Sequence, residues 1–391
     1  MFWRSLVTVL CLSVSAVHAD RHFLSLSDIH YDHGNKMGYG HDSNDEVFSV
    51  MLNQYWRLLP KAEFVLLLGD LPTHLGMESS KRPKDEYVVF NYLYHPDSHH
   101  TVTKPVFYVP GNNDPLTGDY QRFEKHGQSP LTVAASAGWA GPCINCEGQI
   151  IDDSGLATGG YYSAYPMKDD PNMVLIALNT TMFMKKQHYP EYEHQSSAAK
   201  AQLDWLEGQL QHINTKHLLI AMHEPPGKSG GGDSYWKSEY KDRFIDLLSK
   251  YQPAGQRVSL LTSHTHSDEI RKIELSTGNT IYGYSTPSVS MSHKNNPAMK
   301  LFSFDDGYGL SNFTTYYSTP DDIKNKSWGH KRYSAMNDDD SIFPDCHDLR
   351  LGECISQKSV NICKAYDAGK YHGVKSPKMG SFDCDKVLHV N

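Results

Sequence analysis

The sequence predicts a layered α/β fold with a small cysteine-rich appendage at its C-terminal end. Short apolar runs of strand length alternate with segments in which apolar residues recur at helical spacing, as expected for helices packed on a sheet. Several of these runs end in a compact cluster of polar residues. In layered α/β folds, polar side chains at the carboxyl ends of the strands commonly form the functional site.

The N-terminal residues predict a signal peptide at 1–19. Arg4 is the basic residue, residues 6–14 form an apolar core, and Val17-His18-Ala19 supplies a small-residue cleavage site. The apolar core is roughly nine residues long, far short of the about 20 that a membrane-spanning helix needs. We therefore expect a mature chain from about Asp20, no transmembrane segment, and a secreted or extracytoplasmic protein, located in a periplasm, a lysosome or vacuole, or the extracellular space.

The strands and helices of the expected core follow one another along the chain. Strands are expected at 22–27, 63–68, 105–109, 217–222 and 258–262. Helices are expected at 47–59, 88–94, 196–212 and 240–248, and in the third of these Ala199, Leu203, Leu206 and Leu210 share one face. Shorter β-like runs at 269–275, 280–284 and 300–304 suggest antiparallel strands that complete a sheet. We expect a catalytic domain at 20–311.

The C-terminal part, 312–391, is expected to be a cysteine-rich subdomain tied by disulfides, since its apolar content is too low for an independent core. Once Cys11 is removed with the signal peptide, the number of cysteines is even, as in many exported proteins. Cys143 and Cys146 lie in a Gly/Pro-bounded loop, which favours a local disulfide over a redox or zinc motif. The pairing of Cys346, Cys354, Cys363 and Cys384 stays open.

Two further features limit the possible functions. The formal net charge of −8 argues against nonspecific nucleic-acid binding, which needs a basic surface. Sequons at Asn179, Asn312 and Asn325 would carry glycans only in a eukaryotic secretory pathway. The oligomeric state is left open by the sequence.

Five polar clusters follow the main strand-like runs, and they suggest a metal site. Each alone has an ordinary explanation, because Asp-x-His often caps a turn and a lone histidine is often a loop residue. Together, carboxylate, amide and imidazole ligands at successive strand ends can converge on a small group of cations. The clusters are Asp28-Ile29-His30, Gly69-Asp70, Gly111-Asn112-Asn113-Asp114, His223 and His264-Thr265-His266.

The order and spacing of these clusters, over about residues 23–268, resemble the calcineurin-like metallophosphoesterases, whose blocks run D-x-H, G-D, G-N-H-[D/E], H and G-H-x-H. The resemblance implies a β-sandwich flanked by helices and a pair of divalent metal ions. Two such ions about 3.5–4 Å apart activate a water and stabilise the attacking and leaving oxygens. By position, one ion is held by Asp28, His30 and His266, the other by Asn112, His223 and His264, and Asp70 bridges them.

The resemblance narrows to the acid sphingomyelinase-like phosphodiesterase branch. Its motifs match Asp28-Ile29-His30-Tyr31-Asp32 and Gly69-Asp70-Leu71-Pro72-Thr73-His74, and the helix before its metal histidine resembles 202–207. Members of this branch are exported, zinc-dependent and commonly disulfide-bonded near the C-terminus. This implies two divalent ions, Zn²⁺ first and Mn²⁺ or Fe as alternatives. The implied substrate is a nucleotide, a polyphosphate or a phospholipid head group.

Two positions depart from the family pattern. Ser263 replaces a glycine, which costs little because serine is small. Asn113 replaces a histidine that in the family lies near the leaving-group oxygen, and asparagine cannot deliver a proton near neutral pH. Losing a general acid costs about 10²–10⁴ in rate when the leaving group is poor.

Two explanations of Asn113 remain open. The substrate can have a good leaving group, as in a polyphosphate, and endopolyphosphatase-like members of the superfamily also carry G-N-N-D. Alternatively another histidine supplies the acid: His74 is the first candidate, whereas His33 and His41 are weaker ones.

The sequence therefore predicts a secreted phosphoesterase with two metal ions that cleaves a phosphodiester or phosphoanhydride by in-line attack of a metal-bound hydroxide. The alternative within enzymes is an endopolyphosphatase or nucleotide pyrophosphatase. The alternative of another class is a non-catalytic, metal-containing protein that binds a phosphate ligand or a lipid.

Overall fold

The computed structural model describes residues 20–74, 80–95, 102–185, 191–252, 255–338, 341–347, 349–367 and 383–391. The predicted signal peptide lies outside these ranges, so the structure does not test it. Among the helices in these ranges, none is both long enough and apolar enough to cross a membrane.

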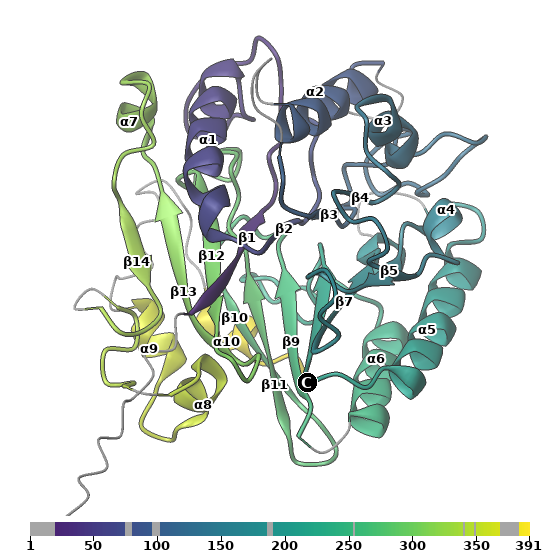
Figure 1. Ribbon diagram of the computed structural model, residues 1–391, viewed down its shortest axis with the longest axis vertical. Coiled ribbons are helices and arrows are strands. Elements are labelled where there is room, and N and C mark those ends of the chain that lie inside the picture. Colours follow the sequence, from purple (N-terminus) through teal and green to yellow (C-terminus); the bar gives the residue numbers. More distant parts are fainter. Residues whose placement is uncertain are drawn as a thin grey trace, which may run out of the picture.

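Two mixed sheets of seven strands each face one another (Figure 1). The first has the order β14-β13-β12-β1-β2-β3-β4, in which β1, β2 and β3 run parallel and the other pairings are antiparallel. Its strands are β1 (Arg21–Leu26), β2 (Phe64–Leu67), β3 (Val106–Tyr108), β4 (Cys143–Ile144), β12 (Ala298–Phe304), β13 (Leu310–Tyr317) and β14 (Arg332–Ser334).

The second sheet has the order β10-β11-β9-β8-β7-β6-β5, and its four central strands β11, β9, β8 and β7 are parallel. Strands β10, β6 and β5 pair antiparallel at the two sides. The strands are β5 (Ile150–Asp152), β6 (Tyr162–Ala164), β7 (Met173–Leu178), β8 (His217–Met222), β9 (Arg257–Thr262), β10 (Ile270–Glu274) and β11 (Thr280–Ser285).

Helices cover the outer face of each sheet (Figure 1). On the first sheet lie α1 (Asp45–Leu58), α2 (Arg82–Tyr94) and α3 (Pro130–Ser136), and on the second lie α5 (Gln195–His212) and α6 (Ser238–Tyr251). Helix α1 begins where Asn44 caps it by accepting a hydrogen bond from the Val47 amide. Short helices complete the fold: η1 (Leu59–Lys61), α4 (Leu156–Gly159), η2 (Thr180–Phe183), α7 (Pro320–Lys324), α8 (Leu351–Ser356), α9 (Ile362–Asp367) and α10 (Cys384–Leu388).

The core divides into three apolar layers, because successive side chains of a strand point to opposite faces. In β1, Phe23 packs between the two sheets, whereas Leu24 packs under the helices of the first sheet. Between the sheets, the Phe23 ring stacks on Phe64 and Phe302 at centroid distances of 4.8 and 4.9 Å. This four-layer arrangement of helices, sheet, sheet and helices confirms the predicted fold class.

The expected elements are present with shifted ends, and others were not anticipated. Strand β8 has the predicted bounds, while the helix predicted at 88–94 already begins at Arg82. Strands β5, β6 and β7 lie in a stretch for which no strands were expected. The three late β-like runs form β10, β11 and β12, but β12 joins the first sheet and β11 pairs parallel to β9.

The C-terminal part contributes strands as well as disulfides. The boundary predicted between 311 and 312 falls inside β13, which pairs with β12 along its length, and β14 follows. The division into domains therefore stays a prediction. The structure pairs Cys143 with Cys146, Cys346 with Cys354, and Cys363 with Cys384.

The three sequons lie in different surroundings. The Asn179 side chain is buried and donates to the Gly159 carbonyl. The Asn312 amide donates to the Met336 carbonyl, whereas Asn325 is exposed at the end of α7. Exposure alone therefore favours Asn325 as a glycan acceptor.

Candidate metal centre

The predicted ligands meet at one edge of the sandwich because they follow parallel strands. Asp28 and His30 come after β1, Asp70 after β2, and Asn112 after β3, all in the first sheet. His223 follows β8, and the pair His264 and His266 follows β9, both in the second sheet. Loops from both sheets thus contribute to a single site.

Two carboxylates lie at the centre of this cluster. Asp28 Oδ1 lies 3.2 Å from His266 Nε2 and 3.7 Å from the Nε2 atoms of His30 and His223. Asp70 Oδ2 lies 3.2 Å from His223 Nε2 and 3.6 Å from His30 Nε2. All of these side chains are buried.

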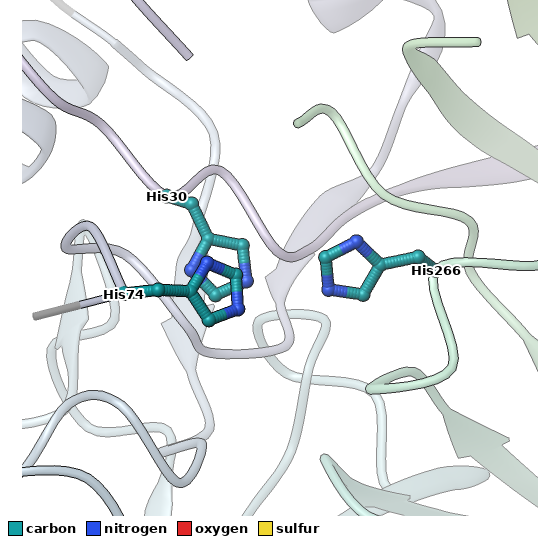
Figure 2. A group of neighbouring side chains, drawn as sticks. All are labelled: His30, His74 and His266. Atoms are coloured by element: carbon teal, nitrogen blue, oxygen red, sulfur yellow. The ribbon is translucent and has the colours of Figure 1, made fainter. Parts of the chain in front are cut away.

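Three groups of side chains have the spacing of metal ligands, with ligand atoms within 4.8 Å of one another. Asp70 belongs to two of them, once with Asp28 and His30 and once with His223 and His264. The third group joins His30, His74 and His266; Figure 2 shows the His74 ring over that of His30, with His266 across from both. A carboxylate shared by two groups has the geometry of a bridging ligand.

Unsatisfied polar atoms test whether the residues fit a cation. Among the ligand candidates, four buried atoms have no hydrogen-bond partner in the described residues: Asp28 Oδ1, His30 Nε2, Asn112 Oδ1 and His223 Nε2. A buried polar atom without a partner costs about 1–3 kcal/mol, and each of these atoms is a suitable ligand for a divalent metal. The donor set therefore fits a group of divalent cations.

Neighbouring groups aim these ligands inward. His30 Nδ1 donates to the Pro72 carbonyl at 3.1 Å, and His223 Nδ1 donates to the Leu68 carbonyl at 2.6 Å, so that each Nε2 is free of a proton when the ring is neutral. The Asn112 amide donates to Asp119 at 2.6 Å, which leaves its oxygen available. Ser263, the departure from glycine, donates to the same Leu68 carbonyl at 3.1 Å and lies 2.9 Å from His223 Nδ1.

The ligand loops adopt an unusual backbone conformation. Asp28, His30, Asp70, His264 and His266 all have positive φ, between 45° and 70°. Residues other than glycine adopt positive φ at a cost in conformational energy, and residues strained in this way cluster at functional sites. The surrounding contacts must hold these turns in place.

Asp114, the last residue of the third cluster, holds two of the loops together. Its carboxylate accepts hydrogen bonds from the amides of Asp70, Leu71 and Gly111, at 3.1, 2.8 and 2.7 Å. The loops approach so closely that a Cβ atom on Gly69 would lie 2.3 Å from the Gly111 nitrogen. Burial, together with the charge of Asp70, raises the pKa of Asp114 to about 6.

The charges of the metal-free cluster are strongly coupled. Burial by itself lowers the pKa of His30, but the neighbouring carboxylates of Asp28 and Asp70 outweigh it and raise that pKa to about 9. For His264, burial and the charge of His223 outweigh the charges of Asp70 and Asp28 and lower the pKa to about 3. Burial also lowers the pKa of His223, but the charges of Asp70 and Asp28 outweigh it and raise that pKa well above its usual range. Two imidazoles, His30 and His223, thus carry protons that offset the two carboxylates of the metal-free cluster.

Asn113 is almost completely buried and faces the shared carboxylate. Its backbone amide donates to Asp70 Oδ1 at 2.8 Å, and its side-chain amide donates to Asp70 Oδ2 at 2.9 Å. The buried guanidinium of Arg82 donates to the Asn113 carbonyl. One N–H of the side-chain amide is therefore directed at Asp70.

His74 lies at the mouth of the site, with 37% of its side chain exposed. Asp42 accepts hydrogen bonds from His74 Nδ1 at 2.7 Å and from its backbone amide at 2.8 Å, and the His74 ring stacks on His30 at 3.7 Å. His33 instead is 75% exposed and bonds Asp45, and His41 is exposed.

The sequence interpretation missed His293 and Asp42. His293 lies between β11 and β12, stacks on His266 at 3.9 Å and lies 6.2 Å from His74, measured between ring centroids. Neither residue follows a strand end, so the pattern that revealed the other candidates gave no signal for them. The mouth of the site is thus flanked by two outer imidazoles, each stacked on an inner one.

Comparison with known proteins gives two relatives whose names describe phosphodiesterases. The chain is 24% identical over 321 residues to "Sphingomyelinase phosphodiesterase D" of Dictyostelium discoideum, covering 78% of this chain and 66% of that protein. It is 21% identical over 309 residues to "Sphingomyelin phosphodiesterase 2" of Caenorhabditis elegans, covering 74% and 47%. The chain thus spans less than two thirds of the length of each relative.

Solved structures with a similar backbone include a purple acid phosphatase from yellow lupin seeds, with 12% identity, a TM-score of 0.48, and coverage of 81% of this chain and 54% of that one. Another is PhoD, with 11% identity, a TM-score of 0.43, and coverage of 77% and 66%. The family model of the calcineurin-like phosphoesterases matches residues 21–268, more than half of the chain and all of the strand-end clusters. The chain belongs to the calcineurin-like phosphoesterase family.

Proposed function

We propose that this protein is an exported phosphoesterase that uses two divalent metal ions to hydrolyse a phosphodiester or a phosphoanhydride. The observation that carries the proposal is the position of Asp70, which is common to two groups of side chains with metal-ligand spacing. The unsatisfied buried atoms around it support the same assignment.

The ligands are assigned as the family resemblance implies. Imidazole and carboxylate ligands suit zinc, and Mn²⁺ or Fe are the alternatives. When bound, the ions would lower the pKa of a water and neutralise charge on the phosphoryl oxygens. One ion would be held by Asp28, His30 and His266, the other by Asn112, His223 and His264, with Asp70 between them.

His74 is proposed to contact the substrate. Because Asp42 accepts from Nδ1, the remaining nitrogen, Nε2, is the atom available to a phosphoryl or leaving-group oxygen at the mouth. Asp42 holds both the ring and the backbone amide of His74, and the fixed ring orientation lowers the entropic cost of that contact. Asn113 is assigned a different role, in orienting the shared carboxylate.

The assignment of Asn113 bears on the substrate. If its amide stays on Asp70, no proton reaches the leaving group from that position. Substrates with good leaving groups are then hydrolysed faster than substrates with poor ones. This favours the second candidate, a polyphosphatase or nucleotide pyrophosphatase activity. The names of the two relatives favour the first candidate, a phosphodiesterase that acts on a phospholipid head group.

Export is part of the proposal. The apolar N-terminal segment and the three disulfide pairs support it, because disulfides persist in oxidising compartments. N-terminal sequencing of the protein secreted by the expression host tests it, and a start near Asp20 is expected.

The central experiment measures metal content and substrate range together. The mature chain is purified, its bound metals are counted by mass spectrometry, and turnover of a bis-aryl phosphodiester, a nucleoside triphosphate, polyphosphate and sphingomyelin is compared between about pH 4.5 and 7.5. Two metals with hydrolysis of at least one substrate are expected. Two metals with turnover of none would favour the non-catalytic binding protein instead.

Variants connect the activity to the site. His74→Ala is expected to lower kcat without changing the metal content, whereas the matched control His33→Ala, at an exposed histidine of the neighbouring loop, leaves both unchanged. Equal effects of the two variants would remove His74 from the mechanism.

A further inference from the structure

A second cavity, of about 550 Å³, lies at the end of the sandwich opposite the metal centre. His217, the first residue of β8, lines it, whereas the metal-ligand candidate His223 follows the last residue of the same strand. At about 3.3 Å per residue the two histidines lie about 20 Å apart. The volume is in the range of pockets that hold small organic ligands.

Arg257 contributes a guanidinium to the lining of this cavity. This first residue of β9 lines the cavity and donates through Nη1 to the Gly307 carbonyl at 3.0 Å. No carboxylate of the described residues forms an ion pair with it. A partly buried guanidinium without an acidic partner is a site that attracts an anion.

A second guanidinium approaches Arg257 from the C-terminal part of the chain. A Cβ atom placed on Gly309 would lie 3.2 Å from Arg257 Nε and 2.4 Å from Arg350 Nε, so the two side chains flank the same short stretch of backbone. Asp305 and Glu353 both pair with Arg350, and among the described residues neither carboxylate pairs directly with Arg257.

Other residues of the lining offer neutral hydrogen-bonding groups. The Tyr284 ring is buried, with 2% of the residue exposed, and its hydroxyl has no hydrogen-bond partner among the described residues, as is also the case for Tyr282. The Gln252 side-chain oxygen is buried and unpartnered. Such groups gain most from a ligand that carries hydroxyl or further oxyanion groups.

We propose that this cavity binds a small organic anion, whose phosphate or carboxylate group lies against Arg257 and Arg350. The remainder of the ligand contacts the hydroxyls of Tyr282 and Tyr284 and the amide of Gln252. The site is separate from the metal centre and does not depend on the function proposed for it.

The test uses the metal-loaded protein, with inorganic phosphate and citrate as probes, in isothermal titration calorimetry at low ionic strength. Phosphate represents a ligand with a phosphate group, and citrate represents a ligand with carboxylate groups. At least one of the two is expected to bind with one-to-one stoichiometry in addition to any binding at the metals. Arg257→Gln is expected to weaken that binding by at least about tenfold, as for loss of a charge-assisted hydrogen bond. Hydrolytic activity is expected to stay unchanged.

Controls separate this site from others. Arg243→Gln, at a partly exposed arginine of α6 that pairs with Asp204, is expected to bind the probes like the parent protein. Tyr284→Phe, which removes only a hydroxyl, is also expected to weaken binding of the probes. This variant replaces Arg257→Gln in the test if Arg257→Gln proves too unstable to measure. The Asp70→Asn variant keeps this binding, because the metal centre is not involved.

Several results would overturn the proposal. They are unchanged affinity in both Arg257→Gln and Tyr284→Phe, loss of all anion binding in Asp70→Asn, and absence of binding of either probe outside the metal centre. Failure of hydrolysis in the parent protein would contradict the proposed function but would leave the anion titration interpretable.

Discussion

Asn113 donates to both carboxylate oxygens of Asp70, from its backbone amide at 2.8 Å and from its side-chain amide at 2.9 Å. Both residues are buried. A carboxylate oriented in this way presents its remaining lone pairs in a fixed direction, which is what a ligand shared by two cations requires. The residue that departs from the family pattern is thus part of the support of the site.

Replacing Asn113 by histidine is expected to restore an acid at the leaving group and to benefit slow substrates most. We expect Asn113→His to raise the rate for an alkyl phosphodiester relative to a p-nitrophenyl ester by up to about 10²-fold. Steady-state kinetics on both esters measures the ratio. Asn113→Ala, which adds no acid, serves as the control and lowers both rates alike; the same ratio in all three proteins would argue against the leaving-group explanation.

Neutralising Asp70 is expected to empty the site. Asp70→Asn removes the charge shared by the two ligand groups, and we expect loss of at least one metal equivalent together with a rate reduced by at least about 10²-fold. Asp246→Asn, at an exposed position of α6, is the matched control and keeps both. Full metal content and activity in Asp70→Asn would show that the two-metal assignment is wrong.

The buried His217 is expected to make a pH-dependent contribution to the free energy of unfolding. Burial lowers its pKa from 6.5 to about 4, even though its Nδ1 donates to the Tyr308 carbonyl. The unfolded chain takes up the proton first as pH falls, so the stability contributed by neutral His217 is complete above about pH 6.5 and is lost progressively towards pH 4. The loss amounts to at most about 3 kcal/mol.

Urea unfolding at several pH values measures this contribution. We expect His217→Gln to be less stable than the parent at pH 7.5 but to lose less stability between pH 7 and 4.5. His212→Gln, at an exposed position at the end of α5, should keep the parent's pH dependence. A parallel pH dependence of parent and His217→Gln would contradict the assignment.

The disulfide between Cys363 and Cys384 is expected to support the metal centre from a distance. It ties α10 to the fold, and Arg271 donates both to the Val387 carbonyl of α10 and to the Pro226 carbonyl in the loop after His223. Replacing both cysteines by serine releases a loop of 21 residues and should cost about 3 kcal/mol of stability.

Thermal unfolding and metal titration check this effect. We expect a lower midpoint and weaker metal binding in the double variant. The corresponding change at Cys346 and Cys354, eight residues apart, should lower stability without weakening metal binding. Equal metal affinity in both double variants would show that the α10 connection does not reach the site.

Local patterns were sufficient for the central strands because these are buried on both faces. The run at 217–222 is apolar apart from its first residue, and the structure gives β8 these bounds. Elements with buried polar residues were harder to predict. Lys300 pairs with Asp268 at 2.6 Å, and Thr315 and Tyr333 donate to the same carboxylate. Such residues look solvent-exposed in a sequence, which is why β13 and β14 were not expected.

The sequence by itself determined the fold class, the family and the residues that follow each parallel strand, because these depend on apolar periodicity and on short motifs. The tertiary structure decided the rest: that Asn113 faces Asp70, that His293 stacks on His266, how the C-terminal cysteines pair, and that Arg257 and Arg350 both lie beside Gly309. These relationships join residues far apart in the chain or on turns with positive φ. Their geometry is fixed only when the two sheets pack together.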